Sequence, residues 1–135
     1  MNQLTPELEA QLWSAAEAAS QRAYAPYSDF HVGAALLTSA GEIVSGCNVE
    51  NASYGLTNCA ERTAIFRAIA EGKLSKGISI AAIAVVNRDH QPCSPCGACR
   101  QVLAEFGGAA VVVYEMDGQR KRATVSALLP ESFQL

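Results

Sequence analysis

Long apolar segments and a strong net charge are both absent from this sequence of 135 residues. The longest apolar run, 78–86, is interrupted by Ser79 and is shorter than the roughly 18 residues that a membrane-spanning helix needs. The formal net charge is −3, which disfavours general binding to nucleic acid, because that affinity comes mainly from Lys and Arg on phosphates. The segment Met1–Glu7 lacks the basic start and apolar core of a signal peptide. We therefore expect a cytoplasmic protein that binds neither membranes nor nucleic acid.

Charged residues are few, at 17% of the chain, whereas hydrophobic residues make up 50%. This composition excludes intrinsic disorder, which requires few apolar groups and a high net charge. Ten glycines and five prolines, with no repeat, also exclude collagen-like and low-complexity sequences. The length predicts one domain, 1–135.

The five cysteines are an odd number, so at least one has no disulfide partner within the chain. In a reducing cytoplasm, cysteines serve as metal ligands or reactive thiols more often than as disulfides. We therefore expect their chemistry to lie in the thiols themselves.

Hydrophobic periodicity and turn residues predict alternating helices and strands. Thr5 and Pro6 are typical of a helix start, and an alanine-rich stripe, which permits close packing, extends to Ala23. Strands are expected at 30–38, 42–48, 78–86, 109–114 and 120–125, and further helices at 59–71, 95–106 and 126–129. Short turns imply antiparallel hairpins, strand–helix–strand connections imply parallel neighbours, and the last strand is expected at an edge. The result is an α/β fold with a mixed five-stranded sheet covered by helices.

Three cysteines lie near predicted helix starts. Cys59 occupies the first position of the second helix, behind a capping Asn58, and Cys96 and Cys99 lie one turn apart in the third. Helix N-termini favour thiolate over thiol, and helices that follow parallel strands start at the same edge of the sheet. Three thiolates at that edge suit Zn²⁺, and a catalytic zinc site keeps its fourth position for water.

Glu61 lies two residues after Cys59, so a ligand and a carboxylate share one helical turn. This makes Glu61 the candidate general base for that water. Zinc with three thiolates has a formal charge of −1, and the neighbouring Arg62 is the cation that offsets it.

Structural interpretations of the same residues stay open. Asn58 and Glu61 have the spacing of a capping box, in which Glu61 only stabilises the helix start. Cys93 or Cys47 would complete a closed four-cysteine structural zinc site, and a lone C-x-x-C also occurs in redox pairs. The alternation around His31 predicts that its side chain faces away from the core. His90 and the charged run 120–122 are expected to be exposed.

The combination of Cys59-Ala60-Glu61 with Pro95-Cys96-x-x-Cys99 is the zinc deaminase pattern. The sequence resembles the homotetrameric zinc-dependent cytidine deaminases over nearly its whole length. Four stretches carry the resemblance, at 27–36, 46–55, 59–65 and 94–102. Cys93 is a departure, because no cysteine is expected there in the family.

The resemblance implies a three-layer α/β/α sandwich of the cytidine deaminase type. It implies hydrolytic deamination of cytidine and 2′-deoxycytidine to the uridine forms plus ammonia, in pyrimidine salvage. The zinc, one ion per subunit, would be held by Cys59, Cys96 and Cys99, and Glu61 would move the protons. A homotetramer with shared active sites is also implied.

The resemblance further implies a nucleoside pocket. Asn48 and Glu50 would hold the ribose hydroxyls, and Glu50 would repel a 5′-phosphate. Phe30 would pack against the pyrimidine, and the Ala60 backbone N–H would contact the base carbonyl. Phe133 would reach across from a neighbouring subunit to cover the base.

Tyr54 and its loop are implied to lie at a subunit interface.

Three other functions remain as alternatives. A blasticidin-type deaminase would share the zinc site but differ around 48–54, and a non-enzymatic module would hold zinc by four thiolates. A polynucleotide editor is disfavoured by the acidic composition and by a pocket that Phe133 closes.

Overall fold

The structure is a computed structural model that describes residues 4–135; residues 1–3, on which part of the signal-peptide prediction rests, lie outside it. Within the described range, no helix combines the length and the apolar character that a membrane crossing requires. The elements follow in the order α1 (Pro6–Ser20), β1 (Val32–Thr38), β2 (Ile43–Cys47), the 3-10 turn η1 (Tyr54–Leu56), α2 (Ala60–Ala70), β3 (Ile80–Asn87), α3 (Gly97–Gly107), β4 (Val111–Met116), β5 (Gln119–Thr124) and α4 (Val125–Leu128).

The five strands form one mixed sheet in the order β2-β1-β3-β4-β5. β1 pairs antiparallel with both β2 and β3, β4 pairs antiparallel with β5, and β3 pairs parallel with β4. The predicted hairpins and the edge position of the last strand are confirmed. Parallel pairing was expected across both strand–helix–strand connections, β2-α2-β3 and β3-α3-β4. Only β3 and β4 pair in this way, because β1 lies between β2 and β3 and separates them.

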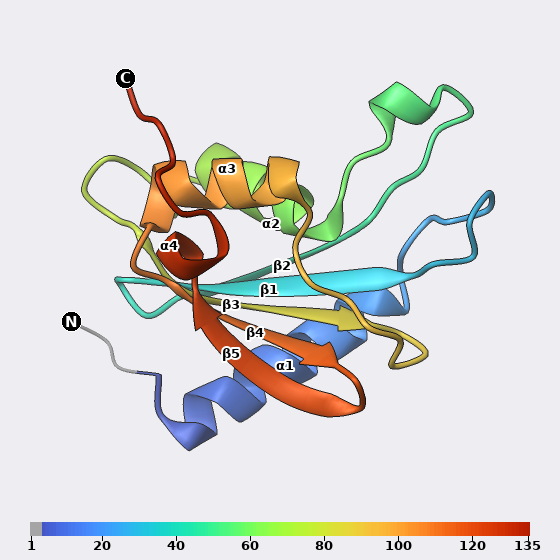
Figure 1. The fold of residues 1–135 in the computed structure, drawn as a ribbon, viewed down its shortest axis with the longest axis horizontal. Helices are drawn as coiled ribbons and strands as arrows, with labels where there is room; N and C mark the ends of the chain where they lie inside the picture. The colour runs from blue at the N-terminus through green and yellow to red at the C-terminus, as the bar shows by residue number, and fades with distance from the viewer. Residues whose placement is uncertain (1–3) are drawn as a thin grey trace.

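Helices cover both faces of the sheet, with α1 on one face and α2, α3 and α4 on the other (Figure 1). All seven residues of β1 are buried, and alternate residues point into two cores. One core joins Leu12 and Ala16 of α1 to Leu37, and the other joins Ile65 of α2 to Leu36. The predicted α/β/α sandwich is therefore confirmed.

Two glycines allow the helices to approach the strands closely. A Cβ atom on Gly33 would lie 2.0 Å from the Ala16 carbonyl oxygen in α1, and one on Gly46 would lie 2.4 Å from the Ala64 nitrogen in α2. Neither backbone can yield easily, so both positions require glycine. The contact at Gly46 sets how α2, and with it the segment 59–62, lies on the sheet.

Some predicted element ends differ from the structure. α1 ends at Ser20, before Ala23. Asn58 does not cap α2, because its side-chain Nδ2 donates to Thr63 Oγ1 at 3.0 Å and its backbone N–H donates to Val49. Cys59 is the N-cap residue instead, with extended backbone angles. α3 likewise begins at Gly97, after an N-cap at Cys96, so Pro95 precedes the helix.

A buried carboxylate joins α1 to the edge strand. Glu9 is 8% exposed and accepts hydrogen bonds from Arg120 and Arg122 of β5, with Arg122 Nε at 2.6 Å. Arg120 also stacks 4.2 Å from the ring centre of Trp13. The hydrogen bond from Arg122 is the main cause that lowers the pKa of Glu9 below its ordinary value of 4.5. Residues 120–122 are exposed, as predicted. However, Arg120 and Arg122 also bind Glu9 of α1.

We expect Glu9→Gln to lower the free energy of unfolding by about 1–2 kcal/mol at pH 7, because a partly exposed, charge-assisted pair is lost. The native carboxyl has the lower pKa, so this stabilisation is complete above pH 4.5 and disappears as pH falls through the native pKa. Urea denaturation of both proteins at several pH values measures it. The exposed Glu7→Gln is the control, with a smaller change. A difference that stays constant down to pH 3 would contradict the ion-pair explanation.

Candidate metal centre and active site

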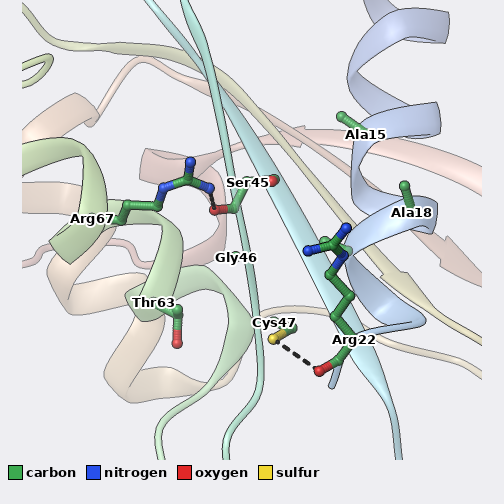
Figure 2. A pocket seen from close by; sticks show the side chains of 9 residues that line it. Ala15, Ala18, Arg22, Ser45, Gly46, Cys47, Thr63 and Arg67 are labelled. Carbon is green, nitrogen blue, oxygen red and sulfur yellow. Dashed lines mark hydrogen bonds between the residues drawn. The ribbon is translucent and has the colours of Figure 1, made fainter. Parts of the chain in front are cut away.

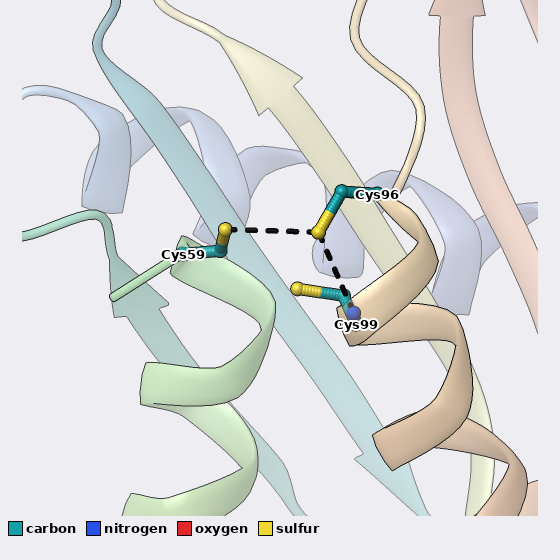
Figure 3. A group of neighbouring side chains, drawn as sticks. All are labelled: Cys59, Cys96 and Cys99. Atoms are coloured by element: carbon teal, nitrogen blue, oxygen red, sulfur yellow. Dashed lines mark hydrogen bonds between the residues drawn. The ribbon is translucent and has the colours of Figure 1, made fainter. Parts of the chain in front are cut away.

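The sulfur atoms of Cys59, Cys96 and Cys99 lie within 4.8 Å of one another. Figure 3 shows the three side chains converging where the N-terminal ends of α2 and α3 meet. Cys59 Sγ lies 3.9 Å from Cys96 Sγ, and the backbone N–H of Cys99 donates to Cys96 Sγ at 3.5 Å. Among residues 4–135, no other three His, Cys, Asp or Glu side chains form such a group.

The position of each cysteine relative to its helix explains this convergence. Cys59 and Cys96 are both N-cap residues, and Cys99 lies in the first turn of α3. The N-terminal N–H groups of a helix have no partners within it and carry partial positive charge, which stabilises thiolates. The prediction that Cys59 is the first helical residue is therefore wrong by one position, but the electrostatic argument is unchanged.

The sulfur geometry fits Zn²⁺. Tetrahedral ligation with Zn–S bonds of about 2.3 Å places two sulfurs about 3.8 Å apart, and the Cys59–Cys96 separation is 3.9 Å. Cys99 is buried, Cys59 is half-buried and Cys96 is exposed, so the group is reachable from solvent. Three thiolate donors with one accessible side are the donor set of an open rather than a closed zinc site.

Arg62 supplies positive charge directly to the sulfur group. Its Nη2 donates to Cys59 Sγ at 3.2 Å. Hydrogen bonds from the Cys99 thiol and from Arg62 lower the pKa of Cys59, and the bond to Cys59 raises the pKa of Arg62. Cys59 is therefore held as a thiolate, and Arg62 stands where the sequence predicted a charge-balancing cation.

Glu61 is buried, with 4% of its surface exposed, and its carboxylate hydrogen-bonds to Cys99. Burial is the main cause that raises the pKa of Glu61 to about 7. A carboxyl group with this pKa can both accept and donate a proton near neutral pH. The capping-box interpretation is wrong, because Asn58 directs its side chain to Thr63 and its backbone N–H to Val49.

The remaining cysteines do not join the group. Cys93 is buried, and its sulfur is not one of the three that lie within 4.8 Å of one another. Cys47 ends β2, half-buried, and its thiol donates to the Arg22 carbonyl at 3.6 Å. His31 is likewise not part of the group; its side chain is 14% exposed, with Nδ1 3.5 Å from Asp29 Oδ1.

Asn48 is buried directly after β2 and orders the segment before β1. Its Oδ1 accepts from the Val32 N–H at 2.9 Å, and its Nδ2 donates to the Phe30 carbonyl at 2.8 Å. Phe30, with 37% of its surface exposed, is thereby fixed at the surface. The sequence indicated a ligand-binding amide but gave no sign of this positioning.

Glu50 organises the neighbouring loop. Its carboxylate accepts from the Tyr27 N–H at 2.9 Å, from the Ser28 N–H at 3.2 Å and from the Ser28 hydroxyl. The hydrogen bond from Ser28 is the main cause that lowers the pKa of Glu50. Glu50 also lines a hollow of about 330 Å³ together with Tyr54. Sequence reasoning missed Ser28, because a serine in a loop carries no specific signal.

The two aromatic side chains expected to act between subunits are both exposed in the single chain. Tyr54, in η1, is 78% exposed, and Phe133, in the C-terminal tail, is 70% exposed. The tail passes along α3, where Gln101 Nε2 donates to the Phe133 carbonyl at 3.4 Å (Figure 1). Ala60, the other expected substrate contact, is fully buried as the first residue of α2.

A second hollow, of about 490 Å³, lies across β2 and contains none of the predicted site residues. Arg22, just after the end of α1, and Arg67 of α2 flank it, as Figure 2 shows. Arg67 is tied to the Ser45 carbonyl at 3.1 Å and pairs with Glu71 at 3.1 Å. No metal-ligand group is present there among the described residues.

Residues 6–115 match the family model of the cytidine and deoxycytidylate deaminase zinc-binding region. A cytidine deaminase from Halalkalibacterium halodurans is 53% identical over 117 residues, with 85% of this chain and 86% of that protein covered. A blasticidin-S deaminase from Bacillus cereus is 32% identical over 120 residues, with 84% and 86% covered.

Solved structures show the same relationship. The crystal structure of a cytidine deaminase from Burkholderia pseudomallei matches with a TM-score of 0.83 and 53% identity. The match covers 92% of this chain and 98% of the Burkholderia chain. A cytidine deaminase structure from Mycobacterium tuberculosis has a TM-score of 0.79 and 40% identity, with 94% and 98% covered. Sequence, fold and sulfur geometry therefore agree, and the chain belongs to the cytidine and deoxycytidylate deaminase zinc-binding family.

Proposed function

We propose that the chain is a zinc-dependent cytidine deaminase, which hydrolyses cytidine and 2′-deoxycytidine to uridine and 2′-deoxyuridine plus ammonia. The observation that carries this proposal is a buried Glu61, with a pKa of about 7, that hydrogen-bonds to Cys99, one of the group of three sulfurs. Relatives named cytidine deaminase, with identities of 53% and 50% over most of the chain, support it. Pyrimidine salvage is the metabolic setting that fits this reaction.

The residues proposed to hold the metal are Cys59, Cys96 and Cys99. When bound, Zn²⁺ supplies Lewis-acid activation of a water molecule near neutral pH. Arg62 balances the excess negative charge of the thiolates through its bond to Cys59. The N-terminal N–H groups of α2 and α3 add to this stabilisation.

Glu61 carries the protons of the reaction. Its carboxylate accepts a proton from the attacking water and delivers it to N3 of the pyrimidine, as the C4–O bond forms. It then transfers the hydroxyl proton to the amino group, the C4–N bond breaks, and ammonia leaves. One carboxyl group serves as base and then as acid, and its burial keeps the proton from exchanging with solvent.

The nucleoside is proposed to bind beside Phe30, with its ribose hydroxyls on Asn48 and Glu50. The two backbone bonds of Asn48 leave one N–H and one lone pair for a sugar hydroxyl. Glu50 is ionised at neutral pH, since its pKa is lowered, so it accepts from a hydroxyl and repels a 5′-phosphate. The Ala60 N–H, at the start of α2, is proposed to donate to the base carbonyl.

A substrate panel tests this proposal. Purified protein is mixed with cytidine, 2′-deoxycytidine, cytosine, adenosine, blasticidin S, a cytidine nucleotide and single-stranded DNA or RNA, and the ultraviolet change is followed with and without a chelator. We expect turnover of the two cytidine nucleosides alone, and its loss with the chelator. Preferential turnover of blasticidin S or of a polynucleotide would overturn the substrate assignment, and no turnover of any compound would overturn the enzymatic one.

We also propose a homotetramer with shared active sites. A group of apolar residues around the substrate loops is exposed, and includes Tyr24, Tyr27, Val49, Tyr54 and Leu56. Tyr27 and Tyr54 form an edge-to-face pair with ring centres 6.3 Å apart. Burial of this surface by a second subunit would remove it from water, and Phe133 would then cover the base in a neighbouring site.

Subunit mixing provides a direct prediction for Phe133. We expect Phe133→Ala to raise the KM for cytidine about 10-fold or more, because a buried aromatic contact contributes about 1.4 kcal/mol or more. Phe133→Ala chains are then mixed with Glu61→Gln chains to form hybrid tetramers. We expect these hybrids to regain activity at low cytidine, because some sites combine Glu61 from a Phe133→Ala chain with Phe133 from a Glu61→Gln chain. Sedimentation velocity measures the oligomeric state of each sample, and we expect a tetramer. A fully active monomer would contradict the shared site.

A further inference from the structure

Arg100 of α3 joins two segments that are far apart in the sequence. Its Nε donates to the Pro95 carbonyl at 2.7 Å, and its Nη1 donates to the Leu128 carbonyl at 2.9 Å. Both bonds are short, and the side chain is half-buried. A helical side chain leans toward the N-terminus of its own helix, which brings this guanidinium back past the start of α3.

The first contact fixes the turn that carries a metal ligand. The Pro95 carbonyl belongs to the same peptide plane as the backbone nitrogen of Cys96. Holding that oxygen therefore sets the orientation of the peptide that enters the N-cap, where Cys96 Sγ accepts from the Cys99 N–H. Pro95 is buried, so its carbonyl has little access to water as a substitute partner.

The second contact fixes the start of the C-terminal tail. α4 has only four residues, and its last carbonyls have no partners within the helix. Arg100 satisfies the carbonyl of Leu128, and Phe133 follows five residues later. The other bonds from tail to helix, Gln101 to the Phe133 carbonyl at 3.4 Å and Gln134 to the Ala104 carbonyl at 3.3 Å, are longer.

A positive charge in the first turn of a helix is electrostatically unfavourable, because that end of the helix is itself positive. Arg100 stands in this place, and its planar guanidinium satisfies two carbonyls at once. A lysine ammonium has the same charge but is a single point on a flexible chain, without the rigid fork of arginine. A comparison of arginine with lysine at position 100 therefore separates the effect of charge from the effect of geometry.

We propose that Arg100 is a positioning residue that holds the Cys96 turn and the base of the Phe133 tail as one unit. It touches neither the metal group nor the nucleoside, and acts through the two carbonyls that it binds. Loss of this link lets the Cys96 turn move relative to Cys59 and lets the tail move relative to α3. The part of this inference that concerns the tail rests on the proposed function of Phe133, whereas the part that concerns the metal does not.

Zinc release tests the metal part without any substrate. Zinc-loaded protein is mixed with an excess of a chromogenic zinc chelator, and the release rate is measured for the parent, Arg100→Lys, Arg100→Ala and two controls. The controls are Gln101→Ala, which loses only a tail contact, and a chain that ends at Leu129, which loses Phe133. We expect release to be about 10-fold faster in both Arg100 variants and unchanged in both controls.

Steady-state kinetics with cytidine tests the tail part. We expect Arg100→Lys to raise KM by a factor at least about 3 times larger than the factor by which it lowers kcat. The truncated chain is expected to change KM in the same direction. If Arg100→Ala does not fold, Arg100→Lys decides both parts, because it retains the charge and most of the packing of the stem.

Parental zinc release by Arg100→Lys would overturn the metal part of the inference, and an unchanged KM would overturn the link to the tail. Accelerated release from the truncated chain would also contradict the proposal, because that chain keeps the carbonyls of Pro95 and Leu128. If the parent failed to deaminate cytidine, the proposed function would fail, but the zinc-release result would still decide the role of Arg100 at the metal turn.

Discussion

Glu61→Gln is expected to lower kcat by at least about 10²–10⁴-fold, the usual contribution of general acid–base catalysis. Glutamine keeps nearly the same volume in a site that is 4% exposed, but its amide can neither accept nor carry the proton. The three sulfurs are untouched, so zinc content should remain at one ion per subunit. The measurement is the rate of cytidine turnover beside the metal content of the same sample.

Glu9→Gln is the matched control for this experiment. It makes the same substitution at another buried glutamate, 8% exposed, which pairs with β5 on the face covered by α1. We expect it to reduce stability while leaving kcat at the parental value. Near-normal turnover by Glu61→Gln would show that Glu61 is only structural, and would remove the base from the mechanism.

Cys99→Ala is expected to abolish zinc binding and, with it, deamination. Cys99 is fully buried between Cys59, Cys96 and Glu61, so its removal leaves two sulfurs for a metal that needs three from the protein. Zinc per subunit should fall from about one to near zero, because metal affinity drops by more than the 10–100-fold typical of outer-shell changes. Metal analysis after gel filtration measures this directly.

Cys93→Ala is the control for Cys99→Ala, because it also removes a buried thiol and lies close to Cys99 in the sequence. Its sulfur lies outside the group of three, so we expect it to hold no metal. We expect full zinc content and full activity, together with a modest loss of stability from the space left behind. Loss of zinc from this variant would favour a closed four-thiolate site and a non-enzymatic module.

Much of the fold was predictable from local patterns. Thr5 caps α1 and accepts from the Leu8 N–H, as the sequence indicated, and Gly72 ends α2 with a positive φ of 73°. The strands follow from apolar runs and short turns. The place of β1 between β2 and β3 was not predictable, because periodicity describes each element but not which strand its neighbour is. The single turn η1 was missed, since three residues are too few to show a period.

The grouping of the three sulfurs with Glu61 and Arg62 was predictable, because the spacing of these residues on helix starts restricts their geometry. The second layer of the site was not. Asn48 bonds to the backbone of Phe30 and Val32, which lie 18 and 16 residues away. Arg100 reaches across 28 residues to Leu128. Such contacts depend on the packed sheet, and single residues of these types carry no signal of them in the sequence.

The proposed catalysis depends on an open zinc site with three protein sulfurs beside a buried carboxyl group. X-ray absorption spectroscopy of the zinc-loaded protein counts the sulfur and the oxygen or nitrogen ligands around the metal. We expect three sulfurs and one lighter ligand in the parent and in Cys93→Ala alike. Four sulfurs in the parent, or an active protein without zinc, would contradict this proposal.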